Sequence, residues 1–250
     1  MKRKAILIGG SNRVGQALMR ELGALYDTLI VITRTPPHSI SENMHIYHVQ
    51  NFDNLAGIIA SMPIGADTDA FSCLDMDKKD AASLDEFYQV NVLFNLDFAK
   101  SCLEKGVTRL FYLSQAGVNA PTKDQKLIAK ADVEYHLQSL GFDELVVFRP
   151  YRLTPPKTQF SLKNAKNLSL HTGLDFGLKL AKNTIENTVG NLGHLISLDK
   201  KPPISPKRVA AAMSLTAYRL HKDNKHRKHS PNFLALSHDD MLAMTEMDGH

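Results

Sequence analysis

A glycine-rich turn near the N-terminus carries residues whose types and spacing suit phosphate binding. The run Gly9–Gly15 (GGSNRVG) follows an apolar stretch of strand length, Lys4–Ile8, and leads into a stretch with helical spacing of its apolar residues. Glycines let a backbone turn tightly and approach a pyrophosphate, and a helix N-terminus offers free N–H groups and a partial positive charge. This strand–turn–helix context predicts a dinucleotide site. Its residues are Gly9, Gly10, Ser11, Asn12, Arg13, Val14 and Gly15.

The end of the second apolar stretch, Thr28–Thr33, indicates which dinucleotide is bound. Sheets of this kind that bind NAD commonly place an acidic residue there for the ribose 2′-hydroxyl, whereas those that bind NADP place an arginine near the 2′-phosphate. This chain has Arg34, with no acid just before it, and Arg13 lies within the glycine turn. Because a guanidinium pairs with phosphate in a bidentate manner, the sequence predicts NADP(H) in preference to NAD(H).

Strand-length apolar runs alternate with helix-length amphipathic stretches along the first 150 residues. Parallel strands need crossover connections, so this alternation predicts a parallel sheet with helices on both faces. The expected strands are Lys4–Ile8, Thr28–Thr33, 44–49, 70–74, Arg109–Leu113 and Glu144–Arg149. The expected helices lie at 14–25, 55–62, 84–104 and 124–140. The predicted fold class is α/β, a Rossmann-type doubly wound parallel sheet with a small C-terminal lobe.

The pattern changes after Pro150. Residues 154–170 are rich in polar side chains and contain a proline pair, which predicts a loop. Helical spacing returns over 209–220, a short strand is expected at 233–236, and a small helix follows. These signals are sparser than those of the first 150 residues.

We therefore expect two parts of the chain with different roles. Residues 1–150 form a dinucleotide-binding Rossmann domain, and 151–250 form a C-terminal substrate or partner lobe that packs on it and does not fold alone. The lobe contains the basic stretch 221–229 (HKDNKHRKH). This stretch has no interleaved aromatic residues and no nucleic-acid motif around it, so we expect a solvated loop.

The composition is that of an ordinary folded domain. With 250 residues, 43% of them hydrophobic and 22% charged, the chain is not mainly disordered. A net charge of +4 is too small to indicate nucleic-acid binding, and no apolar run reaches the length of a membrane span. Cys73 and Cys102 form no zinc or disulfide pattern, which favours a cytoplasmic protein with free thiols.

Five segments of the chain together follow a known pattern. They are 6–15 (ILIGGSNRVG), 71–74 (FSCL), 90–93 (VNVL), 106–114 (GVTRLFYLS) and 148–150 (FRP). This pattern resembles an atypical branch of the short-chain dehydrogenase/reductase superfamily, close to the NmrA-like and Tat-interacting-protein-like NAD(P)-binding proteins. The resemblance covers roughly residues 3–153 and fades afterwards.

The resemblance implies cofactor contacts beyond the glycine turn. Two residues after the third strand would flank the adenine, and three at the end of the fourth strand would line the adenine-side ribose and pyrophosphate. One more would lie on the helix behind the active site, and another near the nicotinamide amide. In that order these residues are Asn51, Phe52, Ser72, Cys73, Leu74, Asn91 and Pro150. The family usually has glycine where this chain has Asn12, whose side chain we expect to project toward the phosphates.

The resemblance also implies a catalytic set, from which this chain departs. Ser114, at the end of the fifth strand, matches the family's catalytic serine. The family's Tyr-x-x-x-Lys pair falls on Lys126 and Lys130, so the lysine that binds the nicotinamide ribose is kept and the proton-transferring tyrosine is lost. Lys126 is either a proton donor whose pKa is lowered by burial or, as we favour, a surface or anion-binding lysine. Tyr151 is a second candidate for proton transfer, although we favour a packing role.

Two functions are consistent with these residues. An NADP-dependent oxidoreductase would act on a small carbonyl or alcohol substrate, assisted by Ser114, Lys130 and either Tyr151 or Lys126. A non-catalytic, NADP(H)-dependent regulator would instead engage a protein partner through its C-terminal lobe, and the missing tyrosine favours this alternative. A third and weaker hypothesis is a scaffold in which Asn12 obstructs the pyrophosphate. We expect no membrane or nucleic-acid partner, and the oligomeric state is not indicated.

Overall fold

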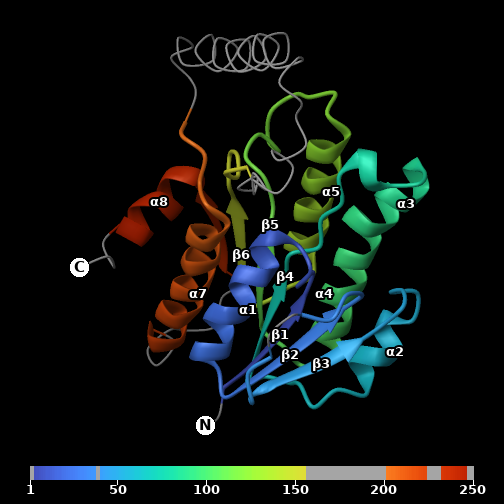
Figure 1. Ribbon diagram of the computed structural model, residues 1–250, viewed down its shortest axis with the longest axis vertical. Coiled ribbons are helices and arrows are strands. Elements are labelled where there is room, and N and C mark those ends of the chain that lie inside the picture. Colours follow the sequence, from blue (N-terminus) through green and yellow to red (C-terminus); the bar gives the residue numbers. More distant parts are fainter. Residues whose placement is uncertain (1–2, 38–39, 156–200, 224–231, 247–250) are drawn as a thin grey trace, which may run out of the picture. The chain divides into compact units, whose positions relative to one another are not determined.

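Seven parallel strands form one sheet in the order β3-β2-β1-β4-β5-β6-β7 (Figure 1). The strands are β1 (Lys4–Ile8), β2 (Thr28–Thr33), β3 (Met44–His48), β4 (Thr68–Ser72), β5 (Arg109–Leu113), β6 (Glu144–Arg149) and β7 (Asn232–Ser237). The chain runs outward from β1 to β3 and then returns to β4 on the other side of β1. This reversal leaves a crevice at the carboxyl ends of β1 and β4, where open α/β sheets bind ligands. The prediction of a Rossmann-type α/β fold is confirmed.

The computed structural model describes residues 3–37, 40–155, 201–223 and 232–246. Residues 1–153 and 204–250 make up one compact unit, and residues 154–203 make up another. All the strands and helices described here belong to the first unit. The loop predicted at 154–170 lies outside the described residues except for its first two positions, and so does most of the basic stretch 221–229.

Helices cover both faces of the sheet (Figure 1). One face carries α1 (Arg13–Leu25), α7 (Pro206–Asp223) and α8 (His238–Glu246), and the other carries α2 (Leu55–Ala60), α4 (Phe94–Glu104) and α5 (Gln125–Ser139). A short 3₁₀ turn, η1 (Lys78–Asp80), follows β4. Within the described residues, none of the helices combines the length and apolar character needed to cross a membrane.

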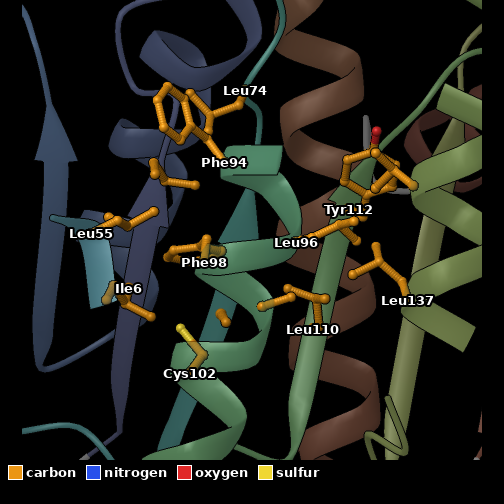
Figure 2. Close-up of a cluster of buried hydrophobic side chains, with 14 of the residues drawn as sticks. Ile6, Leu55, Leu74, Phe94, Leu96, Phe98, Cys102, Leu110, Tyr112 and Leu137 are labelled. Atoms are coloured by element: carbon orange, nitrogen blue, oxygen red, sulfur yellow. The ribbon is translucent and has the colours of Figure 1, made fainter. Parts of the chain in front are cut away.

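The central strands form because their residues are buried on both faces. Every residue of β5 is buried, and so is every residue of β6 except Arg149. Figure 2 shows the core under α4 and α5, where Phe98 and Cys102 of α4 lie near Ile6 of β1 and Leu110 of β5. Such dense burial of large apolar side chains is the main stabilising contribution to a sheet of this kind.

The helix expected over 84–104 is continuous but is not uniformly α-helical. Residues Leu84–Tyr88 form α3, Gln89–Leu93 form a π-helical turn, η2, and α4 follows directly. A π turn is uncommon and often marks a functional site, because it changes the direction in which side chains leave the helix. Here it contains Asn91, which is fully buried.

The C-terminal part of the chain contributes to the same sheet. β7 pairs with β6 along its whole length, and α7 packs against α1. The division expected at residue 150 therefore falls inside one unit, because the strand and helices beyond Ile204 complete the sheet and cover its first helix.

A buried charge network closes the amino ends of the central strands. Asp69 of β4 has no exposed surface and pairs with Arg109 of β5 and with Arg3, whose guanidinium lies 3.3 Å from the carboxylate. The Tyr26 hydroxyl donates a hydrogen bond to the same carboxylate. Burial and the Asp69 charge raise the pKa of Tyr26 far above its ordinary value, so it stays a donor.

Candidate functional site

The turn between β1 and α1 requires glycine at its two ends. Gly9 has a φ of +84°, and a Cβ built there would lie 2.4 Å from the carbonyl carbon of Cys73. A Cβ at Gly15 would lie 2.2 Å from the carbonyl oxygen of Gly9. Both distances are shorter than any real Cβ contact. The glycines therefore allow β1, the turn and the end of β4 to approach one another closely, as the sequence predicted.

Asn12 does not project toward the phosphate position as we expected. Its backbone is extended (φ −78°, ψ 169°), and its side-chain oxygen accepts from the Gly15 N–H at 2.8 Å as the N-cap of α1. Its side-chain nitrogen donates to the Cys73 carbonyl. Both ends of the amide are therefore held inside the turn. The first intrahelical hydrogen bond runs from the Gln16 N–H to the Asn12 carbonyl. The N–H groups of Arg13 and Val14 lie before it, so they are not used within the helix.

A small cavity of about 40 Å³ lies beside the glycine turn at the carboxyl ends of β1 and β2. Arg34 lies on its wall with its guanidinium 5.7 Å from the centre of the buried Phe52 ring. The last residues of β2 include no acid, as the sequence showed. The remaining lining residues are Gly9, Ser11, Asn12, Thr33, Leu74, Asp75 and Val90.

Three residues predicted to contact the nucleotide have other partners. The Ser72 hydroxyl donates to Asn95 at 2.5 Å, and Cys73 is fully buried in the core on the α1 side of the sheet. Neither lines a cavity that the structure describes, whereas Leu74 does. Asn51 is exposed and accepts a hydrogen bond from the Asp53 N–H at 3.4 Å. Ser72 and Cys73 differ in their surroundings because alternate residues at a strand end point to opposite faces of the sheet.

A larger cavity of about 360 Å³ lies at the carboxyl ends of β4, β5 and β6. It brings together five predicted site residues, namely Ser114, Lys126, Lys130, Pro150 and Tyr151. Two acids that the sequence reasoning missed, Asp75 and Asp77, also line it. Both follow β4 in the chain. Their position just after a parallel strand could have indicated them, because ligands bind at the carboxyl ends of such strands. The cavity is completed by Leu113, Gln115, Arg152 and Leu153.

Lys126, at the position where the resemblance implies a tyrosine, is held by two carboxylates. Its Nζ lies 2.7 Å from Asp75 Oδ2 and 2.6 Å from Asp77 Oδ1. Burial alone would lower the pKa of Lys126, but the two adjacent carboxylates outweigh burial and raise it. The alternative in which burial lowers its pKa and makes it a proton donor is therefore wrong.

Lys130 lies one helical turn further along α5 and is 2% exposed. Its Nζ donates to the carbonyl oxygens of Leu74 and Leu113 at 3.2 and 3.1 Å, and it lies 3.3 Å from Asp75 Oδ1. Burial would raise the pKa of Asp75, but Lys130 and Lys126 together hold it below its ordinary value. Asp75 is therefore a carboxylate shared by two ammonium groups.

Ser114 belongs to a second charged cluster on the same side of α5. Its hydroxyl donates to Glu134 Oε1, and Glu134 is 3% exposed. Arg149, the last residue of β6, donates to both oxygens of the same carboxylate, from Nε at 3.1 Å and from its terminal nitrogen. Glu134 stands four residues after Lys130, one turn along the helix, which is the spacing that could have indicated it.

The buried Asn91 supports the loop that carries the two acids. Its side chain accepts from the Met76 N–H and donates to the Met76 carbonyl, both at 3.1 Å. Met76 stands between Asp75 and Asp77, so the π turn fixes the acids through this amide. Asn91 lies behind the cavity, as the family resemblance implied, but it does not line it.

Tyr151 is 42% exposed and follows the end of β6. Its backbone N–H donates to His238 Nδ1 at 3.2 Å, which links the end of β6 to the start of α8. Across the described ranges, no group of three or more His, Cys, Asp or Glu side chains is arranged to hold a metal ion.

Comparison with known proteins gives distant relatives and a clear fold. No family model matches the chain. Two curated relatives are both named "Protein FMP52, mitochondrial": one from Candida albicans is 23% identical over 148 residues, and one from Eremothecium gossypii is 28% identical over 151 residues. Each alignment covers 58% of this chain and 64% of the relative, so the match spans less than two thirds of either relative. The mitochondrial names overturn the expectation of a cytoplasmic protein.

Solved structures of low sequence identity share the fold over nearly the whole chain. The aldohexose dehydrogenase of Thermoplasma acidophilum superposes with a TM-score of 0.62 at 15% identity, covering 96% of this chain and 94% of that one. A short-chain dehydrogenase family protein from Francisella tularensis gives 0.59 at 14% identity, with 97% and 100% covered. MoeE5, in complex with UDP-glucose and NAD, gives 0.58 at 14% identity, with 98% and 82% covered. The fold that the resemblance to the short-chain dehydrogenase/reductase superfamily implied is thus confirmed.

Proposed function

We propose that this protein binds a nicotinamide dinucleotide across the carboxyl ends of β1, β4 and β5, with NADP(H) preferred over NAD(H). The observation that carries the proposal is the turn from Gly9 to Gly15, in which any Cβ at the two end glycines would collide with backbone. Such a turn at a helix N-terminus suits a pyrophosphate, since free N–H groups point at the ligand. The complex of MoeE5 with NAD, on the same fold, supports this placement.

The preference for NADP(H) rests on the side chains at the end of β2. Arg34 is exposed on the wall of the small cavity, and Arg13 is exposed in the first turn of α1. The end of β2 offers no carboxylate to a ribose 2′-hydroxyl. A 2′-phosphate would therefore find guanidinium donors in place of an acid that would repel it.

In the larger cavity, this chain's residues suit the nicotinamide half of the cofactor. Asp75, whose side chain is 30% exposed, could accept hydrogen bonds from ribose hydroxyls, and Lys130 holds this carboxylate in place. Pro150 and Tyr151 also line the cavity. A bound nicotinamide would supply or accept hydride. Ser114 can accept a hydrogen bond from a substrate hydroxyl, because its own proton is donated to Glu134. Tyr151 lines this cavity and is exposed, so its phenol is our candidate for proton transfer.

The first experiment is an equilibrium titration with NADPH and, separately, NADH, followed by cofactor fluorescence. The chain has no tryptophan, so the reduced nicotinamide signal has little protein background. We expect tighter binding of NADPH, and Arg34→Ala should weaken NADPH binding about tenfold while leaving NADH binding unchanged. Lys100→Ala, which removes an exposed charge from α4, serves as the control. If neither cofactor binds, the proposal fails.

A regulatory protein without turnover is the second candidate, and the observation that favours it is Lys126. Its ammonium, held by Asp75 and Asp77, stands where the resemblance implies a proton-transferring tyrosine. Oxidation of NADPH with a panel of carbonyl compounds, lost in Ser114→Ala, would establish an enzyme acting on a small carbonyl or alcohol substrate. Tight binding without turnover, together with NADPH-dependent capture of a protein partner, would establish the regulator.

We further propose a mitochondrial location, supported by the names of the two FMP52 relatives. Fractionation of cells that express the tagged chain tests this. Recovery of the protein in the cytosolic fraction alone would refute it.

A further inference from the structure

The larger cavity offers a ligand fewer hydrogen-bond donors than its composition suggests. An ammonium has three N–H donors, and those of Lys130 have three acceptors in the Leu74 and Leu113 carbonyls and Asp75. The proton of the Ser114 hydroxyl goes to Glu134. These two groups therefore cannot donate to a ligand without first breaking a bond to the protein.

Lys126 is different because two of its three donors are accounted for. Asp75 and Asp77 accept one each, and no third acceptor for its Nζ occurs among the residues that the structure describes. The side chain is 22% exposed and forms part of the cavity wall. One N–H of the Lys126 ammonium is thus available to a ligand there.

The charges around the cavity favour an anion. Three cationic residues line it, Lys126, Lys130 and Arg152, against the two carboxylates of Asp75 and Asp77. Lys126 and Lys130 are paired with Asp75 and Asp77, so the net charge of +1 on the lining is that of Arg152, which is exposed.

We infer that Lys126 receives an anionic oxygen of the substrate, and that the substrate class is an acidic hydroxyl compound, an enol or a phenol, that binds as its oxyanion. The inference rests on the proposed function only in taking this cavity as the substrate pocket. A hydrogen bond from a cation to an oxyanion is roughly twice as strong as one between neutral groups, so a neutral hydroxyl would gain less from this site. The adjacent carboxylates of Asp75 and Asp77 raise the pKa of Lys126 and so favour its charged form.

The test measures binding of 4-nitrophenol without any nicotinamide cofactor. The phenol and phenolate forms differ in absorbance, so a pH series gives the affinity of each form separately. We expect wild-type protein to bind the phenolate at least about tenfold more tightly than the phenol, which corresponds to a fall of one unit in the pKa of the bound probe. Lys126→Gln should abolish this preference, and Lys126→Arg should keep it because the charge is retained.

Lys123→Gln is the matched control, since Lys123 is exposed just before α5 and does not line the cavity. Urea unfolding of each variant shows whether the fold is intact. An unchanged preference in folded Lys126→Gln overturns the inference, and so does wild-type protein that binds neither form or binds both equally. NADPH titration of the same samples separates the proposals: phenolate preference without NADPH binding would refute the cofactor proposal and leave this inference standing.

Discussion

Replacing Asn12 tests both the structure of the glycine turn and its capacity to bind a cofactor. Asn12→Ala removes the side-chain cap from the Gly15 N–H, at a cost of about 1 kcal/mol. It also leaves the buried Cys73 carbonyl without its donor, which costs about 1 kcal/mol more. We therefore expect the free energy of unfolding to fall by about 2 kcal/mol, measured by urea denaturation with an unchanged m-value.

Two further substitutions separate the contributions of Asn12. Asn12→Ser keeps a side-chain acceptor for the Gly15 N–H and removes only the donor to Cys73, so it should lose about half as much stability. Asn12→Gly restores the residue usual in the resembling family. Because the native amide is turned inward, this substitution should not tighten NADPH binding.

Either of two results would refute this reasoning. A loss below about 0.5 kcal/mol in Asn12→Ala would show that the cap and the bond to Cys73 are not formed in solution. An NADPH affinity that rises about tenfold in Asn12→Gly would show that the amide does obstruct the pyrophosphate, as in the scaffold hypothesis.

Three other predictions concern ionisable groups. Asp69→Asn leaves Arg3 and Arg109 without their shared carboxylate and should cost about 3 kcal/mol or more in urea unfolding; a loss under about 1 kcal/mol would contradict the network. The pKa of Asp75 is lowered in the folded protein, so its stabilising contribution is present above the ordinary value of 3.8 and is lost as the pH falls through the folded value. The difference in unfolding free energy between wild type and Asp75→Asn should thus be largest at pH 7 and shrink below about pH 3.8. A difference that grows on acidification would contradict a lowered pKa of Asp75. Burial raises the pKa of Cys73 to about 12 and also raises that of Cys102, so neither thiol should react with a disulfide reagent at pH 8 until urea unfolds the chain, and rapid labelling of folded protein would show that the strand opens.

The strands were predictable where burial on both faces leaves a continuous apolar run. The bounds of Lys4–Ile8, Thr28–Thr33, Arg109–Leu113 and Glu144–Arg149 coincide with the observed β1, β2, β5 and β6. The fourth strand was placed two residues late, because β4 begins with Thr68 and Asp69. These polar residues are fully buried, and Asp69 can be so only because partners distant in sequence neutralise its charge.

The sequence predicted those residues of the candidate site that belong to a motif. It did not predict those that join the site only through contacts with distant parts of the chain. Ser114, Lys126 and Lys130 were found from the family pattern, and they line one cavity with Asp75. Asp75 stands 51 and 55 positions from the two lysines that it bridges in space, so no local spacing reveals the pairing. The same applies to Glu134, whose partner Arg149 lies on another element.

The two lysines at the positions of the resembling family's Tyr-x-x-x-Lys pair are compensated electrostatically. Lys126 and Lys130 are four residues apart on α5, a spacing at which two like charges destabilise a helix. Asp75 removes this repulsion because one carboxylate oxygen lies 2.7 Å from Lys126 and the other 3.3 Å from Lys130. Asn91 fixes the loop that carries Asp75, through the backbone of Met76. The two carboxylates and the loop held by Asn91 therefore allow two ammonium groups to stand one helical turn apart in a partly buried site.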